Sequence, residues 1–161
     1  MPDRVCGTPP SRRNHNLKKR MHHEPDRKGR VHGQDRNDRG RENGASRSSD
    51  GLLDIRLSSP GSARIGTNPE QLFAAGWSAC FESAIALVAR KRKIELQAGV
   101  TIDAEVDLNL GDGGYFLSTQ LNVSLPGVER NAAKTLVDEA HQICPYSKAT
   151  RGNIDVTIKL V

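Results

Sequence analysis

One long apolar run constrains the fold of this chain more than any other feature. Between residues 72 and 89 the only ionisable side chains are those of Cys80 and Glu82. A helix that is apolar nearly all round is usually buried on most of its sides. The run therefore predicts a long central helix inside the core of a single domain.

Local signals mark both ends of this helix. Asn68 is a favourable N-cap, Pro69 suits the first helical position, and Gln71 completes the spacing of a capping box. The pattern predicts a helix that runs on to about Lys93. No uninterrupted apolar run reaches the roughly 18 residues needed to span a bilayer, so we expect no membrane association.

The elements around the helix alternate between strand and helix patterns. Regular alternation of apolar and polar residues predicts a hairpin, and apolar residues three or four apart predict a second helix that ends before Pro145. The expected elements are a strand at 52–57, strands at 100–110 and 115–125 joined by a turn at 111–114, a helix at 131–143 and a strand at 154–161. This order favours an α+β domain.

Charge is distributed unevenly along the chain. Residues 1–49 hold 13 Lys and Arg against six Asp and Glu, whereas residues 50–161 hold 11 against 13. The basic character therefore belongs to a tail, and nucleic-acid binding is not expected of the body. We expect residues 1–39 to be a disordered basic extension and residues 40–161 to form the domain. Because residues 33–39 include no β-branched or aromatic residue, they should form no strand and leave a sheet edge exposed.

Two cysteines stand in the body, Cys80 and Cys144, without the spacing of a CxxC motif. No secretion signal precedes them, so the chemistry expected of them is redox chemistry in a reducing cytoplasm. Cys6 and the four histidines of the tail fit no zinc template, and no metal site is expected; those histidines are His15, His22, His23 and His32.

Two blocks of sequence carry a family resemblance. They are TNPEQLFAAGWSACF at 67–81 and CPYSKATRGNIDV at 144–156. From about Gly40 to Val161 the chain resembles the organic hydroperoxide resistance proteins of the OsmC/Ohr superfamily. The resemblance implies an α+β fold with an antiparallel sheet around a long buried central helix, in an intertwined homodimer. It also implies a cysteine-based peroxidase with no bound cofactor, reduced by dihydrolipoyl groups on a lipoylated protein.

The resemblance assigns roles to four residues. Cys80 is the peroxidatic thiol, which becomes a sulfenic acid, and Cys144 is the resolving thiol, which closes a disulfide with it. Arg41 stabilises the Cys80 thiolate and Glu70 orients Arg41. Arg47 is the alternative to Arg41, because the motif around Arg41 matches less closely: Arg39 stands where the family has glycine.

Spacing adds a constraint on this site. Glu70 and Cys80 are ten positions apart, about 15 Å along a straight helix, so one guanidinium cannot easily contact both. The site is then shared between two subunits, or the helix start is bent. Around it, Trp77 is either a core residue or a substrate contact. Leu72, Phe73 and Phe81 either line an apolar channel or pack in the core. Tyr146, Arg151 and Asp155 shape the site, with no chemical role assigned.

Three other functions remain open from the sequence. The chain is alternatively an OsmC-type peroxidase with a different peroxide preference, an inactive dimer, or a nucleic-acid binder that acts through its basic tail. Turnover of an organic hydroperoxide against hydrogen peroxide separates the first two from the main hypothesis. Deletion of residues 1–39 tests the third.

Overall fold

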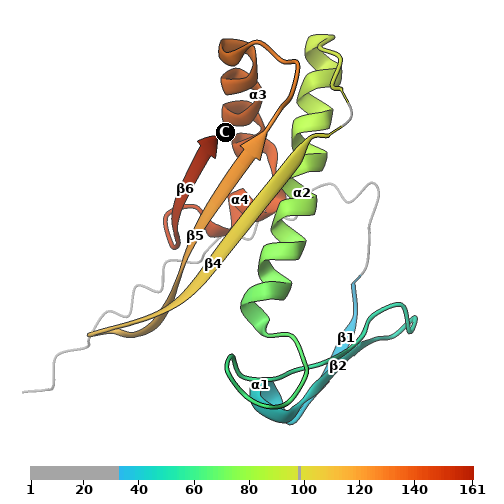
Figure 1. The fold of residues 1–161 in the computed structure, drawn as a ribbon, viewed down its shortest axis with the longest axis vertical. Coiled ribbons are helices and arrows are strands. Elements are labelled where there is room, and N and C mark those ends of the chain that lie inside the picture. Colours follow the sequence, from blue (N-terminus) through green and yellow to red (C-terminus); the bar gives the residue numbers. More distant parts are fainter. Residues whose placement is uncertain (1–32, 98) are drawn as a thin grey trace, which may run out of the picture. The chain divides into compact units, whose positions relative to one another are not determined.

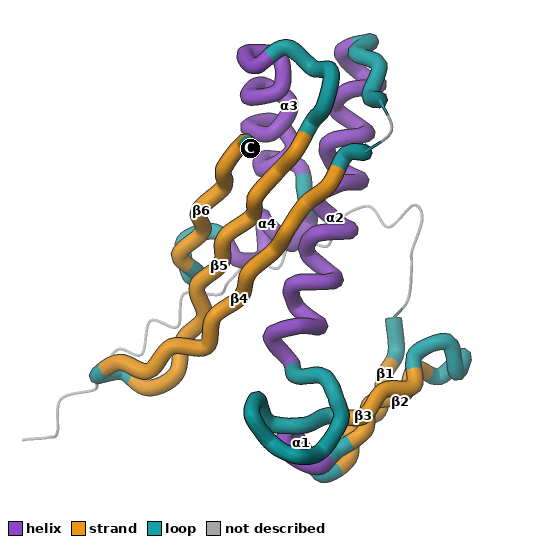
Figure 2. The backbone as a smooth tube through the Cα atoms, viewed as in Figure 1, coloured by secondary structure: helices purple, strands orange, loops and turns teal. Residues whose placement is uncertain are grey.

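The computed structural model describes residues 33–97 and 99–161, and all of these except Gly33 belong to one compact unit, Gln34–Val161. Its strands form two separate three-stranded sheets joined through a long helix (Figures 1 and 2). In chain order the elements are β1 (Asp35–Asp38), α1 (Gly40–Asn43), β2 (Ala45–Ser48), β3 (Asp54–Arg56), α2 (Pro69–Arg92), β4 (Thr101–Gly111), β5 (Gly114–Ser124), α3 (Arg130–Ile143), α4 (Pro145–Thr150) and β6 (Asp155–Leu160). The α+β class predicted from the sequence is confirmed.

The long helix α2 begins where its capping signals predict. The Asn68 side chain accepts a hydrogen bond from the Gln71 N–H at 2.8 Å, and the Gln71 side chain accepts one from the Asn68 N–H at 3.3 Å. Lys93 closes the helix in the left-handed conformation, with φ 58°. This reciprocal capping satisfies N–H groups that the first turn leaves without partners.

By length and composition alone, α2 could cross a membrane, with a mean hydropathy of 1.6 over its most apolar 18-residue window. The expectation that no run is long enough was therefore wrong, because Glu82 is the one charged residue between positions 72 and 89 and hardly lowers the mean. Here α2 packs against β4 and α3 instead. A core helix of this kind has the same composition as a membrane-spanning one.

The second sheet has the order β4-β5-β6. β4 and β5 form the predicted antiparallel hairpin, closed by the two residues Asp112 and Gly113. β6 pairs with β5 in the parallel direction. The sheet is therefore mixed, and the expectation of a purely antiparallel sheet was wrong. A parallel neighbour requires a crossover connection, which α3 and α4 provide.

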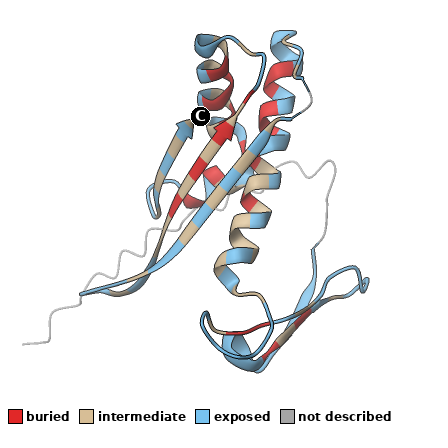
Figure 3. Ribbon diagram, viewed as in Figure 1, coloured by how far each residue is buried: buried red, intermediate tan, exposed pale blue. Residues whose placement is uncertain are grey.

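The core lies where this sheet packs against one face of α2 and against α3, as Figure 3 shows. Side chains with no exposed surface include Trp77, Phe81, Ile85, Leu121 and Leu136. The opposite face of α2 is exposed in the single chain, at Ala75, Ala79, Ala86 and Leu87. The expectation of burial on most sides was thus wrong for one chain alone.

The first sheet has the order β1-β2-β3, with both pairs antiparallel. Its strand β1 lies where no strand was expected. All four of its residues are exposed, and it is held by main-chain pairing to β2 and by the Asp38 carboxylate, which accepts a hydrogen bond from the Ala45 N–H at 3.2 Å. The absence of apolar side chains therefore did not prevent a strand. The rest of the expected extension, residues 1–32, lies outside the described residues.

Candidate active site

Two thiols meet where α2 packs against the start of α4. The Sγ atoms of Cys80 and Cys144 lie 3.4 Å apart, although 64 positions separate the residues in the sequence. Neither is in a disulfide; Cys144 has no exposed surface, and Cys80 is half-buried. A disulfide needs an S–S distance of about 2.05 Å, so a small movement would join them.

The backbone holds Cys144 at a junction between two helices. Its N–H donates to the Ala140 carbonyl at 2.8 Å as the last bond of α3, and its carbonyl accepts from the Lys148 N–H at 3.0 Å as the first bond of α4. Pro145 ends α3 as predicted, and it also occupies the first position of α4, where a missing N–H costs nothing. The thiol is therefore anchored on both sides.

Burial is the main influence on the Cys80 thiol and raises its pKa above the usual value. The backbone N–H of Tyr146 hydrogen-bonds to the sulfur and acts in the opposite direction, while Cys144 adds a smaller rise. Within residues 33–97 and 99–161, no cationic side chain contributes to this pKa. A single chain therefore favours the thiol over the reactive thiolate.

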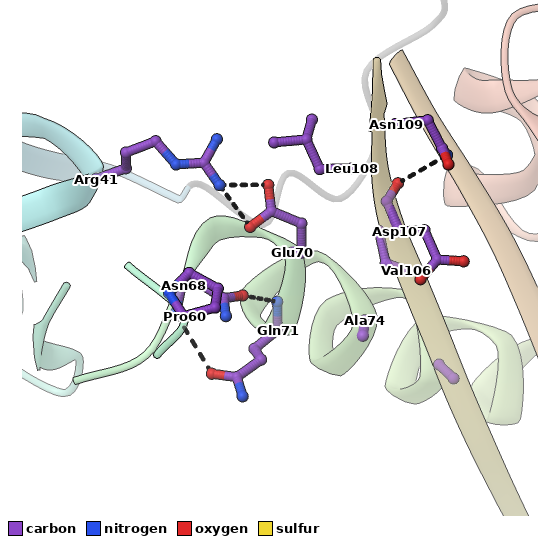
Figure 4. Close-up of a pocket in the computed structure, with 11 residues that line it drawn as sticks. Arg41, Pro60, Asn68, Glu70, Gln71, Ala74, Val106, Asp107, Leu108 and Asn109 are labelled. Carbon is purple, nitrogen blue, oxygen red and sulfur yellow. Dashed lines mark hydrogen bonds and ion pairs between the residues drawn. The ribbon is translucent and has the colours of Figure 1, made fainter. Parts of the chain in front are cut away.

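A cationic group lies elsewhere, at the start of α2. The Arg41 Nη2 atom donates to both carboxylate oxygens of Glu70, at 2.7 and 2.8 Å (Figure 4). Glu70 is mostly buried, with its side chain 13% exposed, and that of Arg41 is 41% exposed. This ion pair is the one that the resemblance implies.

The loop that carries Arg41 has unusual backbone geometry. Arg39 adopts φ 54° and Gly40 φ 63° at the entry to α1. At the exit, a Cβ on Gly44 would lie 2.1 Å from the Asp38 carbonyl oxygen, so only glycine fits there. The turn thereby brings Arg41 back over the first turn of α2.

The Arg41–Glu70 pair borders a cavity of about 570 Å³. Its other walls come from the capping residues of α2 and from the middle of β4, including Asp107 and Leu108 (Figure 4). Neither cysteine lines this cavity. Since Glu70 and Cys80 lie about 15 Å apart along a continuous helix, one chain does not unite its arginine with its thiols.

The alternative arginine, Arg47, has a different partner. Its Nε atom donates to Asp54 at 2.9 Å across β2 and β3, and both side chains are well exposed. Arg47 therefore makes a surface ion pair, whereas Arg41 faces a cavity. Of the two, Arg41 is the one that the structure brings to Glu70.

Aromatic residues around the thiols divide into two groups. Trp77 and Phe81 are fully buried in the core. This favours core packing over a substrate contact for Trp77, and core packing over a channel wall for Phe81. Phe73 and Tyr146 are half-buried, with ring centroids 5.8 Å apart. Leu72 is half-buried on α2, and Asp155 is exposed at the start of β6.

Two contacts of this site were not anticipated from the sequence. The first is the Tyr146 N–H bond to Cys80. The second joins the ends of the segment around Cys144: the Arg151 guanidinium donates to the His141 carbonyl at 2.7 Å and so satisfies a carbonyl in the last turn of α3. A main-chain donor leaves no trace in the residue pattern, but a basic residue soon after a helix end was an available signal.

Fold and site together define an α+β protein with a paired-cysteine site. The chain belongs to the OsmC-like protein family, which matches residues 60–159. Within this family, the chain is 50% identical over 125 residues to an organic hydroperoxide resistance protein of Xanthomonas axonopodis pv. citri. The matched region covers 75% of this chain and 87% of that relative. It is 45% identical to the organic hydroperoxide resistance protein OhrA of Bacillus subtilis over 70% of this chain and 84% of the relative.

A solved structure agrees with these relatives. The crystal structure of the organic hydroperoxide resistance protein OhrB of Bacillus subtilis matches with a TM-score of 0.76 and 41% identity, over 81% of this chain and 98% of that one. The family inferred from the two cysteine-bearing blocks is confirmed.

Proposed function

We propose that this chain is a cysteine-based thiol peroxidase that reduces organic hydroperoxides to alcohols. The observation that carries the proposal is the 3.4 Å separation of a half-buried thiol and a fully buried one. The names of the relatives, organic hydroperoxide resistance proteins, support the substrate class.

The reaction runs in three balanced steps. The Cys80 thiolate attacks the distal peroxide oxygen; the O–O bond breaks, the remaining alkoxide takes a proton and leaves as the alcohol, and Cys80 becomes a sulfenic acid. The Cys144 sulfur then attacks the Cys80 sulfur, which forms a disulfide and releases water. A dithiol, which we take to be a dihydrolipoyl group on a lipoylated protein, exchanges with the disulfide, restores both thiols and becomes a disulfide itself. The last step needs a reducing compartment, and we therefore propose that the protein acts in the cytoplasm.

The first step needs a cation near Cys80, and we propose that a second copy of the chain provides it. Burial raises the pKa of Cys80. In the same chain, Arg41 pairs with Glu70 at the first turn of α2, ten positions before Cys80. In a homodimer, Arg41 and Glu70 of one subunit would face Cys80 and Cys144 of the other.

Uncovered apolar surface supports this homodimer. One face of α2 is exposed in the single chain, and so is the tip of the β4–β5 hairpin, where Leu110 is 70% and Tyr115 74% exposed. Extended apolar surface of this kind usually marks a protein interface. A second copy would cover it.

Single-turnover oxidation tests the chemistry. One equivalent of tert-butyl hydroperoxide should convert Cys80 and Cys144 into an intramolecular disulfide, and the same dose of hydrogen peroxide should react more slowly. Cys144→Ser should stop at the Cys80 sulfenic acid or oxidise further. Peptide mapping that finds Cys6 in the main oxidised bridge would contradict the assignment, and a faster reaction with hydrogen peroxide would favour the other peroxide preference.

A mixed dimer tests the shared site. One subunit carries Glu70→Ala and the other Cys80→Ser. If the pair acts across the interface, one site holds both lesions and the other holds neither, so the isolated heterodimer retains about half of the wild-type turnover. If each site lies within one subunit, both sites are damaged and turnover falls far below half of the wild-type value.

A further inference from the structure

A close contact between Gly76 and Tyr146 lies one helical turn from the two thiols. Gly76 precedes Cys80 by four positions on α2, and Tyr146 follows Cys144 by two positions in α4. A Cβ atom added to Gly76 would lie 2.6 Å from the Tyr146 hydroxyl oxygen and 3.2 Å from its Cζ atom. The ring can rest on the backbone of α2 only because Gly76 has no side chain.

Two aromatic rings flank the half-buried ring of Tyr146. Its centroid lies 5.8 Å from that of Phe73 and 6.4 Å from that of Trp77, and Trp77 is fully buried. A displacement of Tyr146 is resisted on the side of Trp77, because close-packed buried side chains transmit strain to their neighbours. A methyl group at Gly76 would therefore push Tyr146 away from α2 and carry the start of α4 with it.

The start of α4 determines how the two thiols approach each other. The Tyr146 N–H hydrogen-bonds to the Cys80 sulfur, and Cys144 precedes Pro145, the first residue of α4. A shift of Tyr146 thus moves the Cys144 sulfur, two positions earlier in the chain, relative to Cys80. Disulfide closure, which must shorten a 3.4 Å separation, is the step most sensitive to it.

We propose that Gly76 is a positioning residue for the resolving step: by letting Tyr146 rest on α2, it sets the separation between the Cys80 and Cys144 sulfur atoms. Gly76 touches neither the peroxide nor a reacting sulfur. This inference rests on the proposed peroxidase cycle and deepens it. It separates the two thiol steps, because attack on the peroxide does not require Cys144, whereas closure of the disulfide does.

The test compares the two steps in Gly76→Ala and in the wild type. One equivalent of tert-butyl hydroperoxide is added to reduced protein, and sulfenic acid is trapped with dimedone while the disulfide is counted by mass spectrometry after alkylation of free thiols. In Gly76→Ala, loss of the hydroperoxide should stay within about twofold, whereas disulfide closure should slow about tenfold or more, since misplacement by about 1 Å is costly. Dimedone adducts on Cys80 should rise accordingly.

Two further variants keep the result decisive. Removing the hydroxyl in Gly76→Ala/Tyr146→Phe relieves the 2.6 Å contact and should recover most of the closure rate, whereas Tyr146→Phe alone should close normally. Gly113→Ala, in a turn with open space around the added methyl, is the matched control and should behave as wild type. Alanine favours a helix more than glycine does, so Gly76→Ala gains intrinsic helix stability that opposes the strain.

Three outcomes can be told apart. Wild-type closure in Gly76→Ala, or slow closure that the Tyr146→Phe change does not rescue, overturns the role of Gly76. If Gly76→Ala alone fails to fold, normal closure in the double variant still supports the contact, and slow closure there refutes it. If wild-type Cys80 is not oxidised by the hydroperoxide at all, the proposed peroxidase function fails instead.

Discussion

Glu70 accepts two hydrogen bonds from a single nitrogen of Arg41, at 2.7 and 2.8 Å, and Glu70 is much the less exposed of the two. A carboxylate held in the first turn of α2 therefore fixes the direction of a more exposed guanidinium. The helix dipole favours a negative charge at this position as well. Glu70 therefore sets the direction in which the Arg41 guanidinium points.

Glu70→Gln should slow oxidation of Cys80 by about tenfold, because the neutral amide keeps the shape but no longer orients Arg41 by charge. Arg41→Met should cost more, on the order of a hundredfold, since it removes the cation itself. The measurement is the second-order rate with tert-butyl hydroperoxide. Arg47→Met is the matched control, because it breaks an exposed ion pair with Asp54, and it should react at the wild-type rate. If Arg47→Met reacted slowly and Arg41→Met reacted at the wild-type rate, Arg47 and not Arg41 would stabilise the Cys80 thiolate.

The pH dependence of Cys80 should move when Arg41 is removed. Burial raises the pKa of this thiol in the single chain, and a cation from a second subunit would lower it. Alkylation of Cys80 by iodoacetamide, in a Cys144→Ser background, follows the thiolate fraction. Its midpoint should lie at higher pH in Arg41→Met than in the parent. An unchanged midpoint would mean that Arg41 does not act on Cys80.

Arg39→Gly should stabilise the protein by about 0.5–1 kcal/mol, because a left-handed conformation is costly for residues with a side chain and free for glycine. Arg39 has φ 54° and its side chain makes no capping hydrogen bond. Urea unfolding measures the change. Arg36→Gly is the control: Arg36 lies in strand β1, where glycine should be destabilising. If Arg39→Gly were instead less stable, the Arg39 side chain would make a contact that stabilises the fold by more than its left-handed conformation costs.

His141 should make the protein less stable as the pH falls below about 6.5. Burial lowers the pKa of His141, with the charge of Arg151 adding to the effect and Asp138 opposing it. Above the pKa that His141 has in the unfolded chain, its imidazole is neutral in both states and the stability is unaffected. Below that pKa, the unfolded chain binds a proton that the folded chain does not yet bind, so the free energy of unfolding declines. His141→Gln should reduce the difference in unfolding free energy between pH 7.5 and pH 5.5. An identical difference in both proteins would contradict this assignment.

Local signals predicted α2 well, because Asn68, Pro69 and Gln71 act within one turn of the chain. Strand direction was not predictable in the same way: the residues of β6 alternate alike in a parallel or an antiparallel pair. The exposed face of α2 was also hidden, since a helix that is apolar all round does not reveal which side one chain covers. β1 was missed because its pairing depends on main-chain hydrogen bonds.

The site was predictable only in part. Family motifs indicated both thiols, Arg41 and Glu70, and the helical spacing of Glu70 and Cys80 indicated that these residues would not meet in one chain. The separation of the two sulfur atoms depends on tertiary packing across 64 positions, which no local pattern encodes. The contact between Gly76 and Tyr146 was invisible for the same reason.

The parallel pairing of β6 with β5 has a consequence for the order in which the site forms. Cys144 lies in the crossover between these two strands, and the crossover is fastened at its far end only when Asp155–Leu160 pairs with the strand already in place. A strand that follows both cysteines in the chain is thus needed to complete the thiol pair. Until β6 has paired, Cys80 can fold into α2 without a settled partner, so the thiol pair forms later than the helix that carries its first member.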